Sequence, residues 1–232
     1  MTKLFILHGW TYQTETWRPL LEMLTARGID HELLLIPGLT DGTDSPPAGG
    51  WTLDDYVGWL EGKTAGHDKI ILYGHSNGGR ISLAFAAKHP EKVVRLILED
   101  SAGVPPRGMR ALKRDIFKHL SKLGGPLSRS ETLRSLVHTL LRVSDYRKAT
   151  PEMRQTMANL VSVDLQKVLG HIQCPTLIVW GAQDTMTPLE DGRTLHEGIK
   201  NSRLIVLPDA RHSPHITHAQ KLADIVAKEL TP

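Results

Sequence analysis

Short apolar runs alternate along the chain with segments whose apolar residues follow a helical spacing. Six such runs predict strands, at 3–7 (KLFIL), 32–36 (ELLLI), 69–73 (KIILY), 93–98 (VVRLIL), 176–180 (TLIVW) and 203–207 (RLIVL). Continuous apolar runs of this length are typical of strands that are covered on both faces. Helices are predicted between them, at 17–27, 52–62, 78–89, 189–197 and 219–230. The alternation predicts an α/β fold with a doubly wound, mostly parallel sheet of about six strands and right-handed crossovers.

One segment, residues 104–170, interrupts this alternation between the fourth and fifth predicted strands. It contains no convincing strand, and apolar residues recur in it at helical spacing, as in Leu133, Leu136, Val137, Leu140 and Leu141. We therefore predict a helical insertion. The expected organisation is a core made of residues 1–103 and 171–232, with residues 104–170 inserted between its two parts.

The composition is that of a folded protein in a reducing environment. Of the 232 residues, 40% are hydrophobic and 23% are charged, and the single cysteine, Cys174, has no partner for an internal disulfide. The opening residues MTKLFILHGW do not show the pattern of a secretory signal. No apolar run approaches the ~20 residues that a membrane-spanning helix needs. We therefore expect a cytoplasmic protein without stable membrane insertion.

Charge is unevenly distributed along the chain. Between Arg107 and Lys148 there are 11 basic and 3 acidic residues, although the whole chain carries a net charge of only +3. A basic face can attract nucleic acid, anionic lipid or an acidic substrate, but it is also common on solvated surface helices. No zinc-finger spacing or RNA-binding motif accompanies it, so we expect no nucleic-acid partner.

The strongest chemical signal is Gly74-His75-Ser76-Asn77-Gly78, which directly follows the third predicted strand and opens a predicted helix. A nucleophile at such a strand–turn–helix corner has a strained backbone, and the glycines Gly74 and Gly78 allow the neighbouring strand and helix to approach. Ser76 is therefore the candidate nucleophile.

A serine hydroxyl needs a base, and the base needs a group that orients it. Asp184 follows the fifth predicted strand and His212 follows the sixth, so both fall at the edge of the sheet where Ser76 is expected. We predict His212 as the base and Asp184 as the acid that holds it. His215 is the alternative base. Asp100, at the end of the fourth strand beside Glu99, is the alternative acid.

An acyl-transfer site also needs hydrogen-bond donors for the tetrahedral oxyanion. The backbone N–H of Asn77, directly after the nucleophile, is one candidate. The loop His8-Gly9-Trp10 after the first strand supplies the other, because Gly9 lets the backbone turn and the N–H of Trp10 can then face the site.

Taken in order, LHGW, the Pro37-Gly38 turn, WTLDDYVGWL, GHSNGG, GAQD and the His212 loop resemble the α/β-hydrolase superfamily over almost the whole chain. The resemblance implies a helical cap over the active site, at residues 104–170, that supplies much of the substrate pocket. Members often have two strands before the HG loop, whereas this chain begins at that strand, so a reduced sheet is expected. The single glycine of LHGW, in place of a lipase-type HGGG, favours small or medium acyl groups.

The resulting hypothesis is a carboxylesterase-type serine hydrolase that cleaves esters of short to medium acyl chains through an acyl-enzyme. The same residues could instead cleave a C–C bond, a lactone or a thioester, or the fold could serve as a ligand-sensing binding protein. No HExxH motif, paired cysteines or GxGxxG sequence after a strand is present, so we expect no metal and no cofactor. The expected partner is a small-molecule ester substrate.

Overall fold

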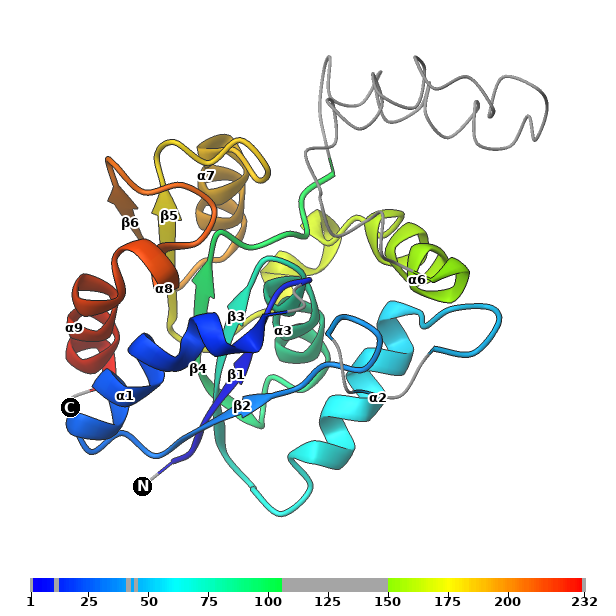
Figure 1. The fold of residues 1–232 in the computed structure, drawn as a ribbon, viewed down its shortest axis with the longest axis horizontal. Coiled ribbons are helices and arrows are strands. Elements are labelled where there is room, and N and C mark those ends of the chain that lie inside the picture. Colours follow the sequence, from blue (N-terminus) through cyan, green and yellow to red (C-terminus); the bar gives the residue numbers. More distant parts are fainter. Residues whose placement is uncertain (1, 11–12, 41–42, 44–45, 106–149, 231–232) are drawn as a thin grey trace.

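The computed structural model of this chain describes residues 2–10, 13–40, 43, 46–105 and 150–230 (Figure 1). Six strands of the described chain form one sheet: β1 (Leu4–Leu7), β2 (His31–Leu34), β3 (Ile70–His75), β4 (Val93–Glu99), β5 (Thr176–Gly181) and β6 (Ser202–Leu207). Their order is β2-β1-β3-β4-β5-β6, and every neighbouring pair is parallel. The predicted six-stranded parallel sheet is thereby confirmed.

The direction in which the strands are added reverses once in this sheet. The chain passes from β1 outward to β2 and then returns to β3 on the other side of β1. Ligands of open parallel sheets commonly bind beyond the carboxyl ends of the strands at such a reversal. The loops that follow β1 and β3 are therefore the natural place for a site, and they hold Gly9 and Ser76.

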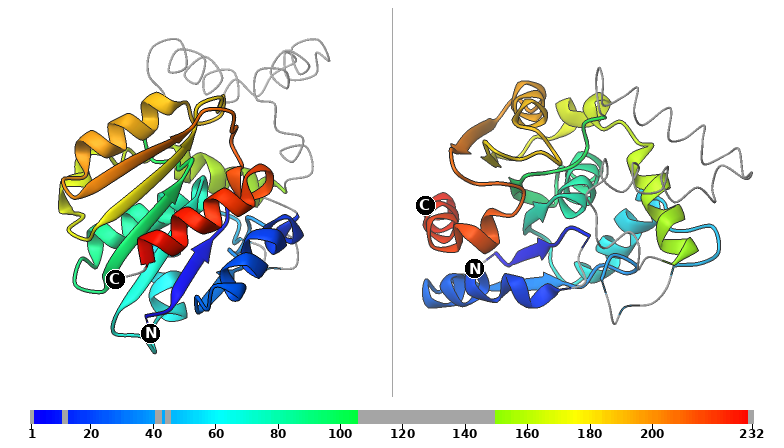
Figure 2. Two further views of the ribbon diagram at one scale, coloured as in Figure 1. Left: turned by 90° about the vertical axis from the view of Figure 1, so that its left-hand side faces the viewer. Right: turned by 45° about the horizontal axis from the view of Figure 1, so that its top comes forward.

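Helices cover both faces of the sheet (Figure 2). On one face lie α1 (Arg18–Ala26) and α9 (Ala219–Leu230), and on the other lie α2 (Leu53–Lys63), α3 (Asn77–Lys88) and α7 (Leu189–Gly198). Two buried clusters result, one on each face. The first contains Leu20, Leu24, Leu222 and Val226, and the second contains Tyr56, Leu60, Phe85 and Leu195. Burial of this apolar surface on both faces is the main stabilising contribution to the fold.

The observed elements differ from the predicted ones mainly at their ends. Helix α2 begins one residue later than predicted, because the Thr52 hydroxyl accepts the N–H of Asp55 while the Asp55 carboxylate accepts the N–H of Thr52. The edge strands β2 and β6 are partly exposed, whereas the apolar pattern predicted full cover. Two short helices were not predicted, η1 (Thr14–Trp17) and α8 (Pro214–Thr217), since four residues are too few to show a periodicity.

Residues 106–149, which include most of the predicted cap and the basic stretch, lie outside the described residues. The rest of the predicted cap contains α6 (Pro151–Val161) and the 3₁₀ helix η4 (Gln166–His171). Leu160, Leu165 and Leu169 belong to the buried cluster that also contains residues of α3 and α7. No helix in the described part of the chain has the length and apolar character needed to cross a membrane.

Candidate active site

The predicted nucleophile sits at a sharp corner between β3 and α3. Ser76 has a φ of 52° and a ψ of −118°, a conformation that non-glycine residues rarely adopt and that is often found at functional sites. The flanking glycines make the corner possible. A Cβ on Gly74 would lie 2.5 Å from the Cα of Gly79, and one on Gly78 would lie 2.1 Å from the carbonyl oxygen of Leu7. These close backbone contacts explain the glycines that the sequence shows on either side of Ser76.

The structure brings Ser76, His212 and Asp184 together from three loops at the carboxyl edge of the sheet. Nε2 of His212 lies 3.1 Å from Oγ of Ser76, and Nδ1 lies 2.7 Å from Oδ2 of Asp184. The side chain of His212 is 15% exposed and that of Asp184 is fully buried. A hydroxyl, an imidazole and a carboxylate bonded in series can move the hydroxyl proton to the imidazole while the carboxylate holds the ring in place.

Asp184 is surrounded by hydrogen-bond donors besides His212. The backbone N–H groups of Met186 and Thr187 donate to Oδ1, at 2.7 and 3.1 Å, and the Thr187 hydroxyl donates to Oδ2 at 2.6 Å. Burial acts to raise the pKa of Asp184, but the hydrogen bonds from His212, Thr187 and Met186 outweigh it and lower the pKa. Asp184 is therefore a carboxylate that can hold a proton on Nδ1 of His212. The sequence analysis did not single out Thr187, although an aspartate commonly forms a turn by bonding the backbone two residues further on.

The alternative acid, Asp100, lies near Asp184 but forms a different contact. It is fully buried with a φ of 42°, and its Oδ1 accepts the N–H of Gly181 at 2.8 Å. Its Oδ2 has no hydrogen-bond partner among the described residues. Burial, and then the charges of Glu99 and Asp184, raise the pKa of Asp100 well above its ordinary range. A carboxyl in this position keeps its proton near neutral pH.

Asp100→Asn is expected to stabilise the protein, and increasingly so as the pH rises. The folded protein keeps the Asp100 proton at a pH where the unfolded chain, with a pKa of 3.8, has lost it. The stability of the unaltered protein therefore falls with rising pH above that value, by up to about 1.4 kcal/mol per pH unit, and asparagine removes this dependence. Urea unfolding from about pH 5 to pH 8 measures the difference between variant and unaltered protein. Asp209→Asn, at an exposed position, is the control, and a difference that does not change with pH would mean that Asp100 is ionised in the folded state.

The loop after β1 packs directly against Ser76. A Cβ on Gly9 would lie 2.9 Å from Cβ of Ser76, so only glycine allows this approach. The preceding His8 is buried, its Nε2 accepts the N–H of Ile36 at 3.0 Å, and its Nδ1–H donates to the carbonyl of Gly9 at 2.5 Å. Burial lowers the pKa of His8 to about 4, so the ring is neutral and holds the loop by both nitrogens. The sequence analysis passed over this role of His8.

The other predicted oxyanion donor, the N–H of Asn77, lies at the start of α3, where backbone N–H groups have no partner within a helix. The side chain of Asn77 donates to Sδ of Met157 on α6 at 3.4 Å. Arg80 on α3 donates to the carbonyls of Leu160 and Val163, at 2.6 and 3.2 Å. Helix α6, from the predicted cap range, is thus bonded to α3, the helix that follows Ser76.

His75, Glu99 and His215 form the one cluster in the described part of the chain whose ligand-type atoms could surround a metal ion, all lying within 4.8 Å of one another. All three residues are buried. The alternative base, His215, is hydrogen-bonded to Glu99, with 2.9 Å between Nδ1 of His215 and Oε1 of Glu99. His212, and not His215, contacts the hydroxyl of Ser76. The absence of a metal from the reaction stays a prediction.

Comparison with known proteins agrees with this fold and site. The family described as alpha/beta hydrolase fold matches residues 3–219. Among curated proteins, the pimeloyl-[acyl-carrier protein] methyl ester esterase of Neisseria meningitidis serogroup B is 28% identical over 243 residues, covering 95% of this chain and 90% of the relative. Among solved structures, the enol-lactonase of Burkholderia xenovorans LB400 has a TM-score of 0.76 at 20% identity, covering 100% of this chain and 92% of that one. A thermophilic esterase of Thermogutta terrifontis has a TM-score of 0.74 at 22% identity, covering 99% and 89%.

The parallel sheet, the glycine-flanked corner at Ser76 and the family match over residues 3–219 define the class of protein. The chain belongs to the α/β-hydrolase fold family, which confirms the resemblance seen in the sequence. Its curated relatives include esterases, and general ester hydrolysis is therefore the activity that fits this chain.

Proposed function

We propose that this protein is a serine hydrolase that cleaves carboxylic esters of short to medium acyl chains through an acyl-enzyme. The observation that carries the proposal is the unbroken hydrogen-bonded series from Ser76 through His212 to Asp184, with distances of 3.1 and 2.7 Å. In this proposal Ser76 is the nucleophile, His212 the base and Asp184 the acid that orients His212. The N–H groups of Trp10 and Asn77 are the proposed oxyanion donors.

The first half of the reaction transfers the acyl group to the protein. Oγ of Ser76 attacks the ester carbonyl carbon and its proton passes to Nε2 of His212. Negative charge builds on the carbonyl oxygen, where the N–H groups of Trp10 and Asn77 stabilise it. The tetrahedral species then collapses, the C–O bond to the alcohol breaks, and His212 gives its proton to the departing alkoxide. Asp184 stabilises the imidazolium throughout this step.

The second half releases the acid. Water takes the place of the alcohol, loses a proton to the neutral His212 and attacks the acyl carbon. The second tetrahedral species collapses, the bond to Oγ breaks, and the proton on His212 returns to Ser76. No metal or cofactor is required in this scheme.

Chelation with EDTA should accordingly leave the rate of ester turnover unchanged.

The test combines a covalent probe with a substrate panel. A fluorophosphonate reagent should modify Ser76, since it reacts with activated serines, and mass spectrometry of the peptides locates the adduct. Turnover of p-nitrophenyl acetate and butyrate should be sustained, with a burst of p-nitrophenol if deacylation is slow. A methyl ester of a dicarboxylic acid belongs in the panel, because the curated relative from Neisseria meningitidis is a methyl ester esterase. An adduct elsewhere, or no turnover of any ester, would contradict the proposal.

Other outcomes of the same panel point to the alternatives. Faster turnover of lactones, thioesters or β-diketones than of esters would assign the same residues to a different hydrolysis. A single turnover, together with a rise in melting temperature on adding a small ligand, would indicate a ligand-sensing protein. The unbroken Ser76–His212–Asp184 series favours repeated turnover, because the base that both half-reactions need is in contact with the hydroxyl and with the carboxylate that orients it.

We also propose that residues 104–170 act as a cap on a core of residues 1–103 and 171–232. The contact between Asn77 and Met157 of α6 supports this division, since it puts part of the predicted cap beside the nucleophile. Residues at this contact would then limit the length of the acyl group.

Met157→Ala should shift the ratio of kcat/KM values from p-nitrophenyl acetate toward longer p-nitrophenyl esters.

A further inference from the structure

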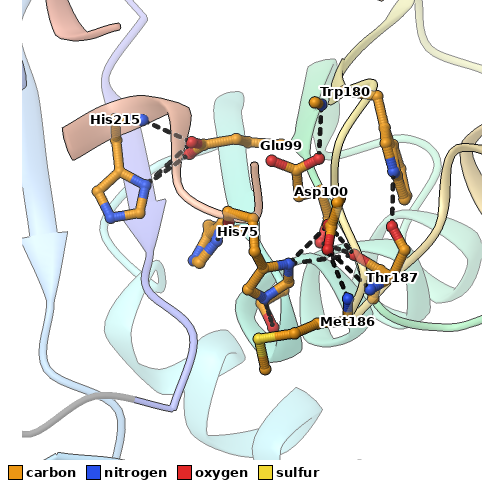
Figure 3. A network of polar contacts seen from close by, with 11 residues as sticks. His75, Glu99, Asp100, Trp180, Met186, Thr187 and His215 are labelled. Carbon is orange, nitrogen blue, oxygen red and sulfur yellow. Dashed lines mark hydrogen bonds and ion pairs between the residues drawn. The ribbon is translucent and has the colours of Figure 1, made fainter. Parts of the chain in front are cut away.

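A second carboxylate–histidine pair lies beside the pair formed by Asp184 and His212. Glu99, the last residue of β4, accepts from Nδ1 of His215, which lies 2.9 and 3.1 Å from its two oxygens. Oε1 also accepts the backbone N–H of His215 at 2.7 Å (Figure 3). The side chain of Glu99 is fully buried and that of His215 is 4% exposed. The hydroxyl of Ser76 is hydrogen-bonded to His212 and not to this second pair. The proposed reaction therefore gives the Glu99–His215 pair no role.

Other residues fix this second pair firmly. The hydroxyl of Tyr73 donates to Oε2 of Glu99 at 2.7 Å. The ring of Trp17 stacks on the ring of His215, with 4.0 Å between centroids and 12° between planes. Burial acts to raise the pKa of Glu99, but the charge of His215 and these hydrogen bonds outweigh it and lower the pKa to about 2. Glu99 is thus a buried carboxylate whose oxygens are satisfied by donors.

His75 connects this pair to the backbone of the predicted base. Its Nε2 lies 2.7 Å from the carbonyl oxygen of His212, and a carbonyl can only accept, so Nε2 carries the proton. The ring of His75 packs edge-on against that of His215, with 4.6 Å between centroids, and lies 5.0 Å from that of His212. Burial lowers the pKa of His75 to about 3, which keeps the ring neutral. His75 directly precedes Ser76 in the chain, so it links the nucleophile corner to the base.

The backbone around His212 is consequently held at two points. His75 holds the carbonyl of His212, and Glu99 holds the N–H of His215, three residues further along. Both anchors are side chains from the buried carboxyl ends of the central strands β3 and β4. A displacement of a reacting group by about 1 Å can cost a hundredfold in rate. The contact of 3.1 Å between His212 and Ser76 therefore depends on where these anchors put the loop.

We propose that His75, Glu99 and His215 form a buried positioning unit that fixes the backbone of His212, so that its ring stays within reach of Ser76. The inference rests on the proposed function, because it assigns the unit to the same reaction. These residues act through His212 and do not touch the substrate. Hydrogen bonds already occupy Nε2 of His75, Nδ1 of His215 and both oxygens of Glu99.

The experiment compares two variants of His75 with matched size. In His75→Gln the side-chain amide can still donate to the carbonyl of His212, whereas in His75→Leu it cannot. We expect leucine to lower kcat for p-nitrophenyl butyrate about a hundredfold with KM unchanged, and glutamine to recover most of that loss. The rate of fluorophosphonate labelling should fall in parallel, since it also needs the base. Circular dichroism and urea unfolding establish that each variant is folded under the assay conditions.

A second pair of variants tests how the side chain of His215 holds Glu99, the other anchor, in place, and it replaces the first pair if His75→Leu does not fold. His215→Asn keeps a donor near the position of Nδ1, and His215→Leu removes it, so asparagine should retain more kcat than leucine. Equal kcat for the donor and non-donor variants at both positions would overturn the proposal. So would activity of the unaltered protein that EDTA abolishes and Zn²⁺ restores, because the three residues would then hold a metal. Absence of turnover in the unaltered protein is a different result and would reject the proposed function itself.

Discussion

Ser76→Ala is expected to lower kcat for ester hydrolysis by about a millionfold. In a Ser-His-Asp set, removing the serine alone costs about as much as removing all three residues. The alanine variant has no oxygen that can attack the carbonyl carbon or give a proton to Nε2 of His212, which lies 3.1 Å from Oγ. Removing Oγ from this position leaves the backbone corner unchanged, because the Cβ remains. Steady-state turnover of p-nitrophenyl butyrate and the loss of fluorophosphonate labelling both measure the effect.

Ser202→Ala is a suitable control for this variant. Ser202 begins β6 at the amino end of the strand, at the opposite edge of the sheet from the candidate site. Within the part of the chain that the structure describes, its hydroxyl bonds to groups of residues 196–199. Its variant should keep full turnover. If Ser76→Ala also kept substantial turnover, another nucleophile would be acting and the proposed function would need to be rejected.

Asp184→Asn is expected to lower kcat by about ten-thousandfold, the loss found when asparagine replaces the acid of a Ser-His-Asp set. Oδ2 of Asp184 lies 2.7 Å from Nδ1 of His212, and Oδ1 is occupied by the N–H groups of Met186 and Thr187. These two donors keep the amide oxygen of asparagine at the position of Oδ1, so its NH₂ group faces Nδ1. His212 must then carry its proton on Nε2, which can no longer accept the proton of Ser76.

Two further aspartates serve as controls for this result. Asp209, which is largely exposed and pairs with His218, should give an asparagine variant with full turnover. Asp100→Asn distinguishes the alternative acid, because Asp100 is buried beside the site and bonds to Gly181. Turnover should survive in Asp100→Asn and be lost in Asp184→Asn. The reverse pattern, measured with the same substrate, would make Asp100 the acid.

Strand and helix positions could be predicted because each is encoded locally. The apolar runs at 69–73 and 176–180 correspond to strands β3 and β5, since central strands must be apolar on both faces. Gly74 and Gly78 could likewise be interpreted from the sequence, because only glycine permits the backbone approaches on either side of Ser76. The local patterns did not reveal α8, a four-residue helix in which Glu99 from a distant strand accepts the N–H of His215.

The sequence predicts the pairing of His212 with Ser76 and Asp184, but it could not exclude the alternatives. Asp100 and Asp184 both follow strands, as do His212 and His215, so the sequence left two alternatives for each role. Side-chain direction settles the pairing in the structure, and it depends on backbone angles that a pattern does not specify, such as the φ of 42° at Asp100. The catalytic roles of the pair in contact with Ser76 await the variants described above.

The sequence by itself determined the parallel α/β sheet, the corner at Ser76 and the positions of Asp184 and His212 after the fifth and sixth strands, because these follow from local apolar patterns and glycine positions. The tertiary structure alone decided that His212 meets Ser76 and Asp184 while His215 meets Glu99 and Trp17. These contacts join residues that lie up to 198 positions apart, from Trp17 to His215. The physical reason is that such pairings arise only when packing of the whole sheet brings its carboxyl ends to one edge.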